Sequence, residues 1–144
     1  MFYSSAMFTL KPDFEEVLNR YESWWHAEVA DRPLVSITFP KPAAERRPFP
    51  VKQHPTLRDR WLDAEYVVAA AETRLHNTVH FADSLPVVWP NLGPEVFSAF
   101  YGCEMEYGES TAWSKPILND CSEESLSALR LDTGNFYYRK LMEM

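Results

Sequence analysis

Asp83 is the residue whose surroundings most favour chemistry. It follows the β-forming run Thr78–Phe81 and precedes the apolar run Leu85–Trp89. A carboxylate buried at the end of a strand has a raised pKa and can serve as an acid, a base or an acceptor for ligand N–H groups. The alternative is an aspartate that caps the following turn, which is a common role. The sequence leaves both interpretations open.

Arg46 and Arg47 form a second candidate for chemistry. They stand in a loop over residues 40–55 that holds five of the eleven prolines and follows a predicted strand. Adjacent arginines can grip carboxylates or phosphate through bidentate hydrogen bonds. A solvated cluster of loop charges is the alternative. Because long loops in compact domains are often functional, we retain both interpretations.

The histidines and cysteines give a weaker signal. His76 and His80 are four residues apart, a spacing that places two metal ligands on one helix face. The glutamate of an HExxH motif and an obvious third ligand are both missing, so two unrelated histidines are the favoured interpretation. Cys103 and Cys121 lie 18 positions apart without a CxxC motif, which indicates two reduced thiols. We therefore expect no metal site within these residues.

The composition excludes several classes of function. The net charge of −7 gives no general attraction to nucleic acid or to acidic lipid. The sequence has no GxGxxG, GxxxxGK[ST] or GxSxG motif, and its four glycines leave little room for a loop that cradles phosphate. It shows neither a signal peptide nor an apolar run long enough to span a membrane. These features predict a cytoplasmic protein without a nucleic-acid or membrane partner.

The hydrophobic pattern alternates helices with strands. Such alternation is typical of α/β units, and residues 1–144 are expected to form a single domain or part of one. Asp13 and Glu16 have the spacing of a capping box at the first helix, and Thr56 is placed to cap the second. The expected elements are an arm over 1–11, helices over 13–30 and 56–77, strands over 34–39, 78–81 and 85–89, a short helix from Pro94 to Gly102, an extended segment over 108–118, and terminal helices split near 133–135.

Several short segments resemble uroporphyrinogen decarboxylases. The segment Phe81–Val88, with Leu92-Gly93 after it, is similar to the F-S-D-x-L-x-V…L-G segment of that family. Gly102–Glu106 and Trp113–Ile117 resemble the next segments of the same family. A tryptophan-rich helix and then Asp31-Arg32-Pro33 resemble the start of its decarboxylase-like branch. The superfamily also includes corrinoid-dependent methyltransferases.

The resemblance implies a fold. It predicts an α/β chain that forms the N-terminal part of a (β/α)8 TIM-type barrel, rich in helix and incomplete in these residues. A full barrel of this kind takes about 250 residues. Because an incomplete barrel exposes strand edges and apolar faces, a homo-oligomer or a complementary chain is the expected partner.

The resemblance also implies a site. Asp83 matches the family aspartate that holds the pyrrole N–H groups of a tetrapyrrole and stabilises positive charge during decarboxylation. Arg46 and Arg47 would meet acidic groups of the ligand, although the RQAGR motif of the family is absent, and Trp89 and Asn91 would line the pocket. No cofactor is implied within these residues, since corrinoid or zinc would require the later half of the family fold. The alternative is a non-catalytic fragment or interaction module that oligomerises through aromatic helix faces.

Overall fold

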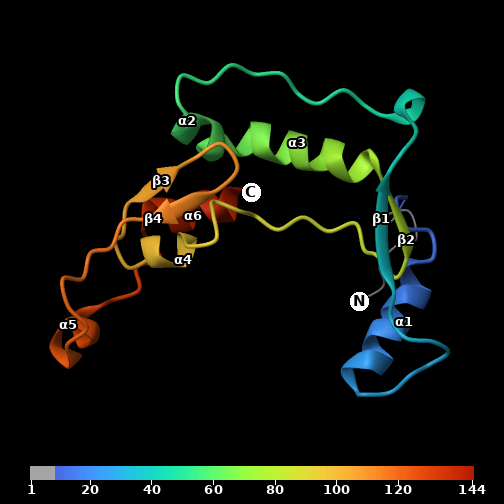
Figure 1. Cartoon of the computed structure of the whole chain (residues 1–144), viewed down its shortest axis with the longest axis horizontal. Helices are drawn as coiled ribbons and strands as arrows, with labels where there is room; N and C mark the ends of the chain where they lie inside the picture. The colour runs from blue at the N-terminus through green and yellow to red at the C-terminus, as the bar shows by residue number, and fades with distance from the viewer. Residues whose placement is uncertain (1–8) are drawn as a thin grey trace. The chain divides into compact units, whose positions relative to one another are not determined.

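Two groups of elements account for the chain in the computed structural model, which describes residues 9–144. The first unit extends to Phe49 and resumes over Ala71–Val88, and the second comprises Pro50–Ala70 and Trp89–Met144. The first unit holds α1 (Phe14–Trp25), β1 (Ser36–Pro40), the 3-10 helix η2 (Ala43–Glu45), the end of α3 (Ala64–His76) and β2 (Thr78–Ala82) (Figure 1). The second unit holds α2 (Leu57–Leu62), the start of α3, α4 (Val96–Ala99), β3 (Met105–Tyr107), β4 (Ala112–Ser114), α5 (Glu123–Ala128) and α6 (Phe136–Glu143).

The strands form two separate antiparallel pairs. β1 pairs with β2 from Ser36 opposite Ala82 to Pro40 opposite Thr78, and β3 pairs with β4. A (β/α)8 barrel is built from adjacent parallel strands, and no parallel pair occurs among residues 9–144. The predicted TIM-type barrel is therefore wrong. The alternation of apolar residues predicts where a strand runs, but it does not fix the direction of its partner.

The helices begin where the sequence predicts, but several end earlier. α1 stops at Trp25 instead of Ala30, and Asp13 makes no side-chain cap because it pairs with Lys11. The predicted helix over 56–77 is two helices, α2 and α3. They are separated by Asp63, whose carboxylate accepts a hydrogen bond from the N–H of Tyr66 at 3.0 Å and so caps α3.

One predicted helix cap and two predicted strands are confirmed, whereas a third predicted strand is absent. Thr56 caps α2 by accepting a hydrogen bond from the N–H of Asp59, and β1 and β2 lie within two residues of their predicted positions. Residues 85–89 are not a strand. Pro86 and Pro90 remove backbone donors there, and a strand ladder needs those donors. The predicted arm over 1–11 lies mostly outside the described residues.

The apolar core of the second unit is small. Ala99, Met105 and Ala112 are buried together, with Tyr107 and Tyr137 packed against them. Gly93 adopts a φ of +111° and lies so close to Ala112 that a Cβ atom on it would be 2.7 Å from the Ala112 Cβ. Only glycine satisfies both conditions without strain, so this position fixes the approach of the loop before α4 to β4.

Candidate functional site

Asp83 directly follows Ala82, the last residue of β2, and the backbone of Ala82 is strained. Ala82 has a φ of +53°, in the left-handed region that residues other than glycine rarely adopt. This turn carries the Asp83 side chain inward, where it has no solvent exposure. The Asp83 N–H donates to the carbonyl of Val35 at 2.7 Å, and the Val35 N–H donates to the Asp83 carboxylate at 2.8 Å. Asp83 therefore extends the pairing of β1 with β2 by one backbone hydrogen bond and one side-chain hydrogen bond to Val35.

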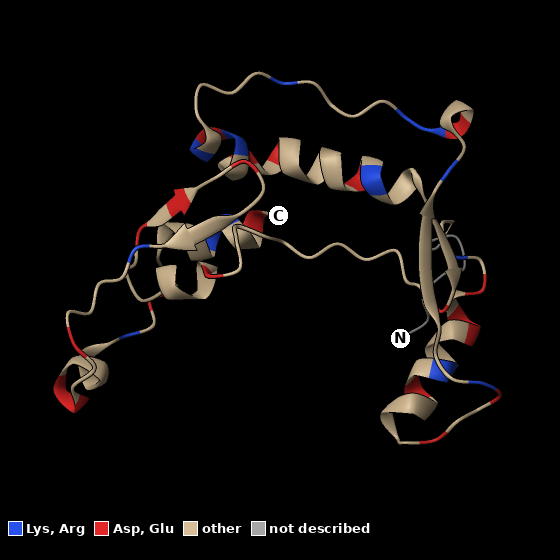
Figure 2. Ribbon diagram, viewed as in Figure 1, with Lys and Arg blue, Asp and Glu red and all other residues tan. Residues whose placement is uncertain are grey.

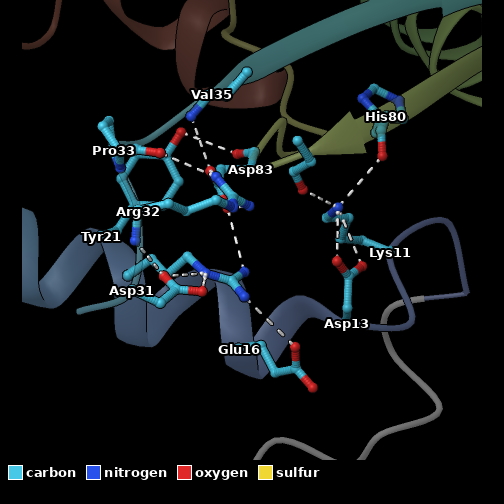
Figure 3. Close-up of polar contacts among 12 residues, drawn as sticks. Lys11, Asp13, Glu16, Tyr21, Asp31, Arg32, Pro33, Val35, His80 and Asp83 are labelled. Atoms are coloured by element: carbon cyan, nitrogen blue, oxygen red, sulfur yellow. Dashed lines mark hydrogen bonds and ion pairs between the residues drawn. The ribbon is translucent and has the colours of Figure 1, made fainter. Parts of the chain in front are cut away.

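Two arginines meet the Asp83 carboxylate. Arg32 donates to both carboxylate oxygens, with Nη2 at 2.9 Å from Oδ1 and Nη1 against Oδ2. Arg20, from α1, places Nη1 at 3.4 Å from Oδ1. The hydroxyl of Tyr21 donates to the Asp83 carbonyl at 3.1 Å. Figure 3 shows these contacts converging on the buried carboxylate from α1 and from the segment before β1.

Asp31 completes a balanced set of charges. The Nε of Arg20 donates to the Asp31 oxygens at 3.1 Å and 3.3 Å. We call Arg20, Asp31, Arg32 and Asp83 the Asp83 cluster. Its two cations and two anions balance, and Glu16 lies 3.8 Å from Arg20 as a further, exposed carboxylate. Such pairing offsets part of the cost of removing these charges from water.

The cluster holds its charges through neutral pH. The hydrogen bond from Arg32 lowers the pKa of Asp83, although burial alone would raise it. The hydrogen bond from Arg20 likewise lowers the pKa of Asp31. The same bonds raise the pKa values of Arg20 and Arg32. The raised pKa that the sequence predicts for a buried Asp83 is thus reversed, because the prediction did not include Arg32.

An open cavity of about 550 Å³ lies beside the cluster. Arg32 is in its wall, and so is Lys11, whose ammonium group donates to Asp13 at 3.1 Å and to the carbonyls of His80 and Ala82. Lys11 is almost fully buried, so these acceptors fix its position. The cavity volume is in the range of small-molecule sites. Its lining residues are Lys11, Asp13, Arg32, Val35, His80, Phe81 and Ala82.

The structure places the predicted arginines at the far end of the sheet. Asp83 follows the Ser36–Ala82 end of the ladder, whereas Arg47 is bound to Asn77, which precedes the Pro40–Thr78 end. Five residues of antiparallel strand separate these ends by about 14 Å. Arg46 and Arg47 are therefore not partners of the Asp83 carboxylate.

Trp89 and Asn91 belong to the second unit, whereas Asp83 and the two predicted arginines belong to the first. Trp89 is 82% exposed. The Asn91 side chain accepts a hydrogen bond from the Gly93 N–H at 2.8 Å and so stabilises its own turn. The predicted set does not form one site within either unit. Its role in binding remains a prediction.

Comparison with protein-family models, with curated protein sequences and with solved structures finds no match to this chain. The resemblance to uroporphyrinogen decarboxylases therefore depends on the short segments alone. It stays a hypothesis, and any chemistry assigned to the chain has to rest on its own residues.

Sequence reasoning missed the residues that hold Asp83. The sequence pattern around Arg32 indicates only a segment that ends a helix, with Asp31 and Pro33 on either side. Arg20 lies outside the predicted apolar stripe of the first helix, so the sequence gives no reason to expect it near Asp83. The sequence marks Arg32 only by its place in Asp31-Arg32-Pro33, directly before the predicted strand. Nothing in the sequence links it to Asp83, 51 positions later.

The metal and membrane predictions can be compared with the described part of the chain. His76 ends α3 and His80 lies in β2, so their spacing of four is not helical. Within residues 9–144 no group of three His, Cys, Asp or Glu side chains is placed to hold a metal ion. Cys103 and Cys121 are both free. No helix in the same range has the length and apolar character needed to cross a bilayer.

Proposed function

We propose that the chain binds a carboxylate-bearing tetrapyrrole in the cavity beside Asp83, in keeping with its resemblance to enzymes that act on tetrapyrroles or transfer methyl groups from corrinoids. One observation carries the proposal. Arg32 lines an open cavity of about 550 Å³ and is fixed there by the buried, ionised Asp83. A cation held by a second residue is preorganised for an acidic ligand group.

The cavity wall offers both kinds of contact that such a ligand needs. Arg32 pairs with Asp83 but keeps 36% of its side chain exposed, so its guanidinium can also donate to a carboxylate arm. The ammonium group of Lys11 is already bound to Asp13 and to the carbonyls of His80 and Ala82, and it contributes charge without a direct contact. Val35 and Phe81 supply apolar surface for the face of a macrocycle. Ligand sites commonly combine a mainly apolar wall with a few fixed polar groups.

In this proposal Asp83 is a positioning residue. Its oxygens already accept hydrogen bonds from Arg32, Arg20 and the Val35 N–H. A pyrrole N–H would have to displace one of these donors, whereas an acidic group can approach Arg32 while the cluster remains intact. The carboxylate then acts on the ligand through the guanidinium that it holds.

The test is a fluorescence titration of the full chain with coproporphyrin. Arg32→Gln is expected to weaken binding by roughly tenfold, because it removes a charged contact. Arg130→Gln, at an exposed arginine that donates to nearby backbone carbonyls, is the matched control and should leave the affinity unchanged. Far-UV circular dichroism establishes that each variant is folded. An Arg130→Gln loss equal to that of Arg32→Gln would show that the effect is one of general charge, and an unchanged affinity for Arg32→Gln would contradict the proposal.

A second candidate function is assembly through an apolar sheet face. Ile37 and Phe39 of β1 and Phe81 of β2 share one face, because Ile37 lies opposite Phe81 in the register. They are 45%, 46% and 56% exposed, and the rings of Phe39 and Phe81 are in contact at 6.4 Å between centroids. Contiguous exposed apolar surface of this kind marks an interaction site.

This assembly has its own test. Sedimentation at tens of micromolar should give a mass above that of one chain, and Phe39→Ser should shift the population toward the monomer. A single-chain mass for the unaltered protein would contradict assembly and would leave the tetrapyrrole proposal untouched.

A further inference from the structure

The end of the β1–β2 ladder that lies away from Asp83 carries three cationic side chains. Lys41 follows β1 directly, and Arg46 and Arg47 follow η2. None of the ion pairs found within residues 9–144 includes any of the three. Glu45 stands beside them in η2 and is exposed, but it forms no ion pair with them. In Figure 2 the Lys and Arg segments just past β1 are coloured blue.

The loop that carries these cations is held by its backbone. The Arg47 N–H donates to the side-chain oxygen of Asn77 at 2.8 Å, and the Asn77 side-chain amide donates to the Arg47 carbonyl at 2.8 Å. The Lys41 N–H donates to the Asn77 carbonyl at 2.8 Å, and Arg46 Nε donates to the Lys41 carbonyl at 2.5 Å. Asn77 is buried. The loop is therefore fixed without using the ammonium group of Lys41 or the guanidinium of Arg47.

His76, the last residue of α3, lies in the field of these cations. Its Nδ1 atom is buried and has no hydrogen-bond partner among the described residues. Burial lowers the pKa of His76, and the positive charges of Arg47 and Lys41 lower it further. The ring is consequently neutral at neutral pH. The neutral ring of His76 therefore adds no positive charge to that of Lys41 and Arg47.

We propose that Lys41 and Arg47 form a binding site for an oxyanion, a carboxylate or a phosphate group, at the α3 end of the β1–β2 ladder. The backbone N–H groups of Lys41 and Arg47 both donate to Asn77, so the two side chains start from neighbouring points of the backbone. Two cations placed in this way repel each other, and an anion bound by both reduces that repulsion. The planar guanidinium of Arg47 suits two oxygens of a carboxylate or phosphate, and the Lys41 ammonium supplies a point charge. Arg46 braces the loop through Lys41. This site lies at the opposite end of the ladder from the proposed tetrapyrrole cavity and does not depend on it.

His76 provides the readout for a test on the full chain. The pH titration of its ring resonance is followed by NMR in chloride, in inorganic phosphate and in citrate at equal ionic strength. A bound anion offsets the charges of Arg47 and Lys41, so phosphate or citrate should raise the His76 pKa in a saturable manner. Phosphate acting alone identifies a phosphate site, and citrate acting alone identifies a carboxylate site.

Two variants separate a specific site from general screening. Arg47→Gln should weaken the anion affinity by roughly tenfold, because it removes the bidentate charged contact. Arg130→Gln, at an exposed arginine that donates to nearby backbone carbonyls, is the matched control and should match the unaltered chain. Equal His76 titrations in all three salts, or an equal loss of affinity in both variants, would overturn the proposal.

Discussion

The two ends of the β1–β2 ladder use the same residue types in opposite ways. At the Asp83 end, two arginines and two aspartates pair with one another, and the central carboxylate has no solvent exposure. At the α3 end, Lys41, Arg46 and Arg47 have no carboxylate partner within ion-pair distance among residues 9–144, and Asn77 holds their loop through the backbone. The charged groups at the Asp83 end pair with one another, whereas the cations at the α3 end have no ion-pair partner among the described residues.

Solvation explains the contrast. A buried carboxylate loses its hydration, so its partners must replace those contacts, and removing one partner is costly. An exposed arginine keeps its water, and an ion pair there adds little stability. The difference between the ends therefore predicts unequal effects of similar substitutions.

Asp83→Asn should give the largest loss of stability. The neutral amide cannot replace the carboxylate as acceptor for Arg32 and Arg20, which leaves their charges partly unpaired next to a buried group. We expect the free energy of unfolding to fall by about 3 kcal/mol in urea denaturation. A loss below about 0.5 kcal/mol would show that the cluster does not hold the fold.

Asn77→Ala should give the next largest effect, at the other end of the ladder. It removes the two side-chain hydrogen bonds to the Arg47 backbone and leaves those backbone groups without their partner. About 2 kcal/mol of stability should be lost, at roughly 1 kcal/mol for each bond. Amide hydrogen exchange should show faster exchange of the Arg47 N–H. Unchanged exchange at that position would mean that Asn77 does not fix the loop.

Acid should produce a smaller, graded effect that depends on the Asp83 cluster. The pKa of Asp83 is lowered in the folded chain, so its contribution to stability is complete above the ordinary carboxyl pKa of about 3.9 and declines as pH falls through the folded value. The unaltered chain should therefore lose stability below about pH 4. Asp83→Asn should follow a shallower curve, with a remaining slope from the other carboxyls whose pKa values are lowered, namely Asp31, Asp63, Glu95 and Asp120. Parallel curves for the two proteins would contradict this role.

The sequence predicts local structure better than it predicts partners. The positions of β1 and β2 and the Thr56 cap follow from alternation and from a short polar side chain before a helix, both of which act over a few residues. The antiparallel pairing of β1 with β2 connects residues 38 to 46 positions apart, and the bond between Arg32 and Asp83 connects residues 51 positions apart. No local pattern encodes such contacts, so the predicted barrel is wrong and the cluster is missed.

The candidate site shows the same limit. The sequence singles out Asp83, but the arginines that it places in the same predicted site are Arg46 and Arg47, which would meet acidic groups of the ligand. The structure instead brings Arg20 and Arg32 to Asp83 from α1 and from the segment before β1. Which end of a strand faces which loop depends on strand direction, and local patterns do not supply that direction.

The most direct test compares one substitution at both ends. Urea unfolding midpoints of Arg32→Gln and Arg47→Gln are measured side by side with that of the unaltered chain at neutral pH. We predict that Arg32→Gln lowers the midpoint clearly, because it leaves the buried Asp83 short of its main partner, and that Arg47→Gln leaves the midpoint within error. Equal midpoints for the two variants would contradict the division between a paired end and an open end.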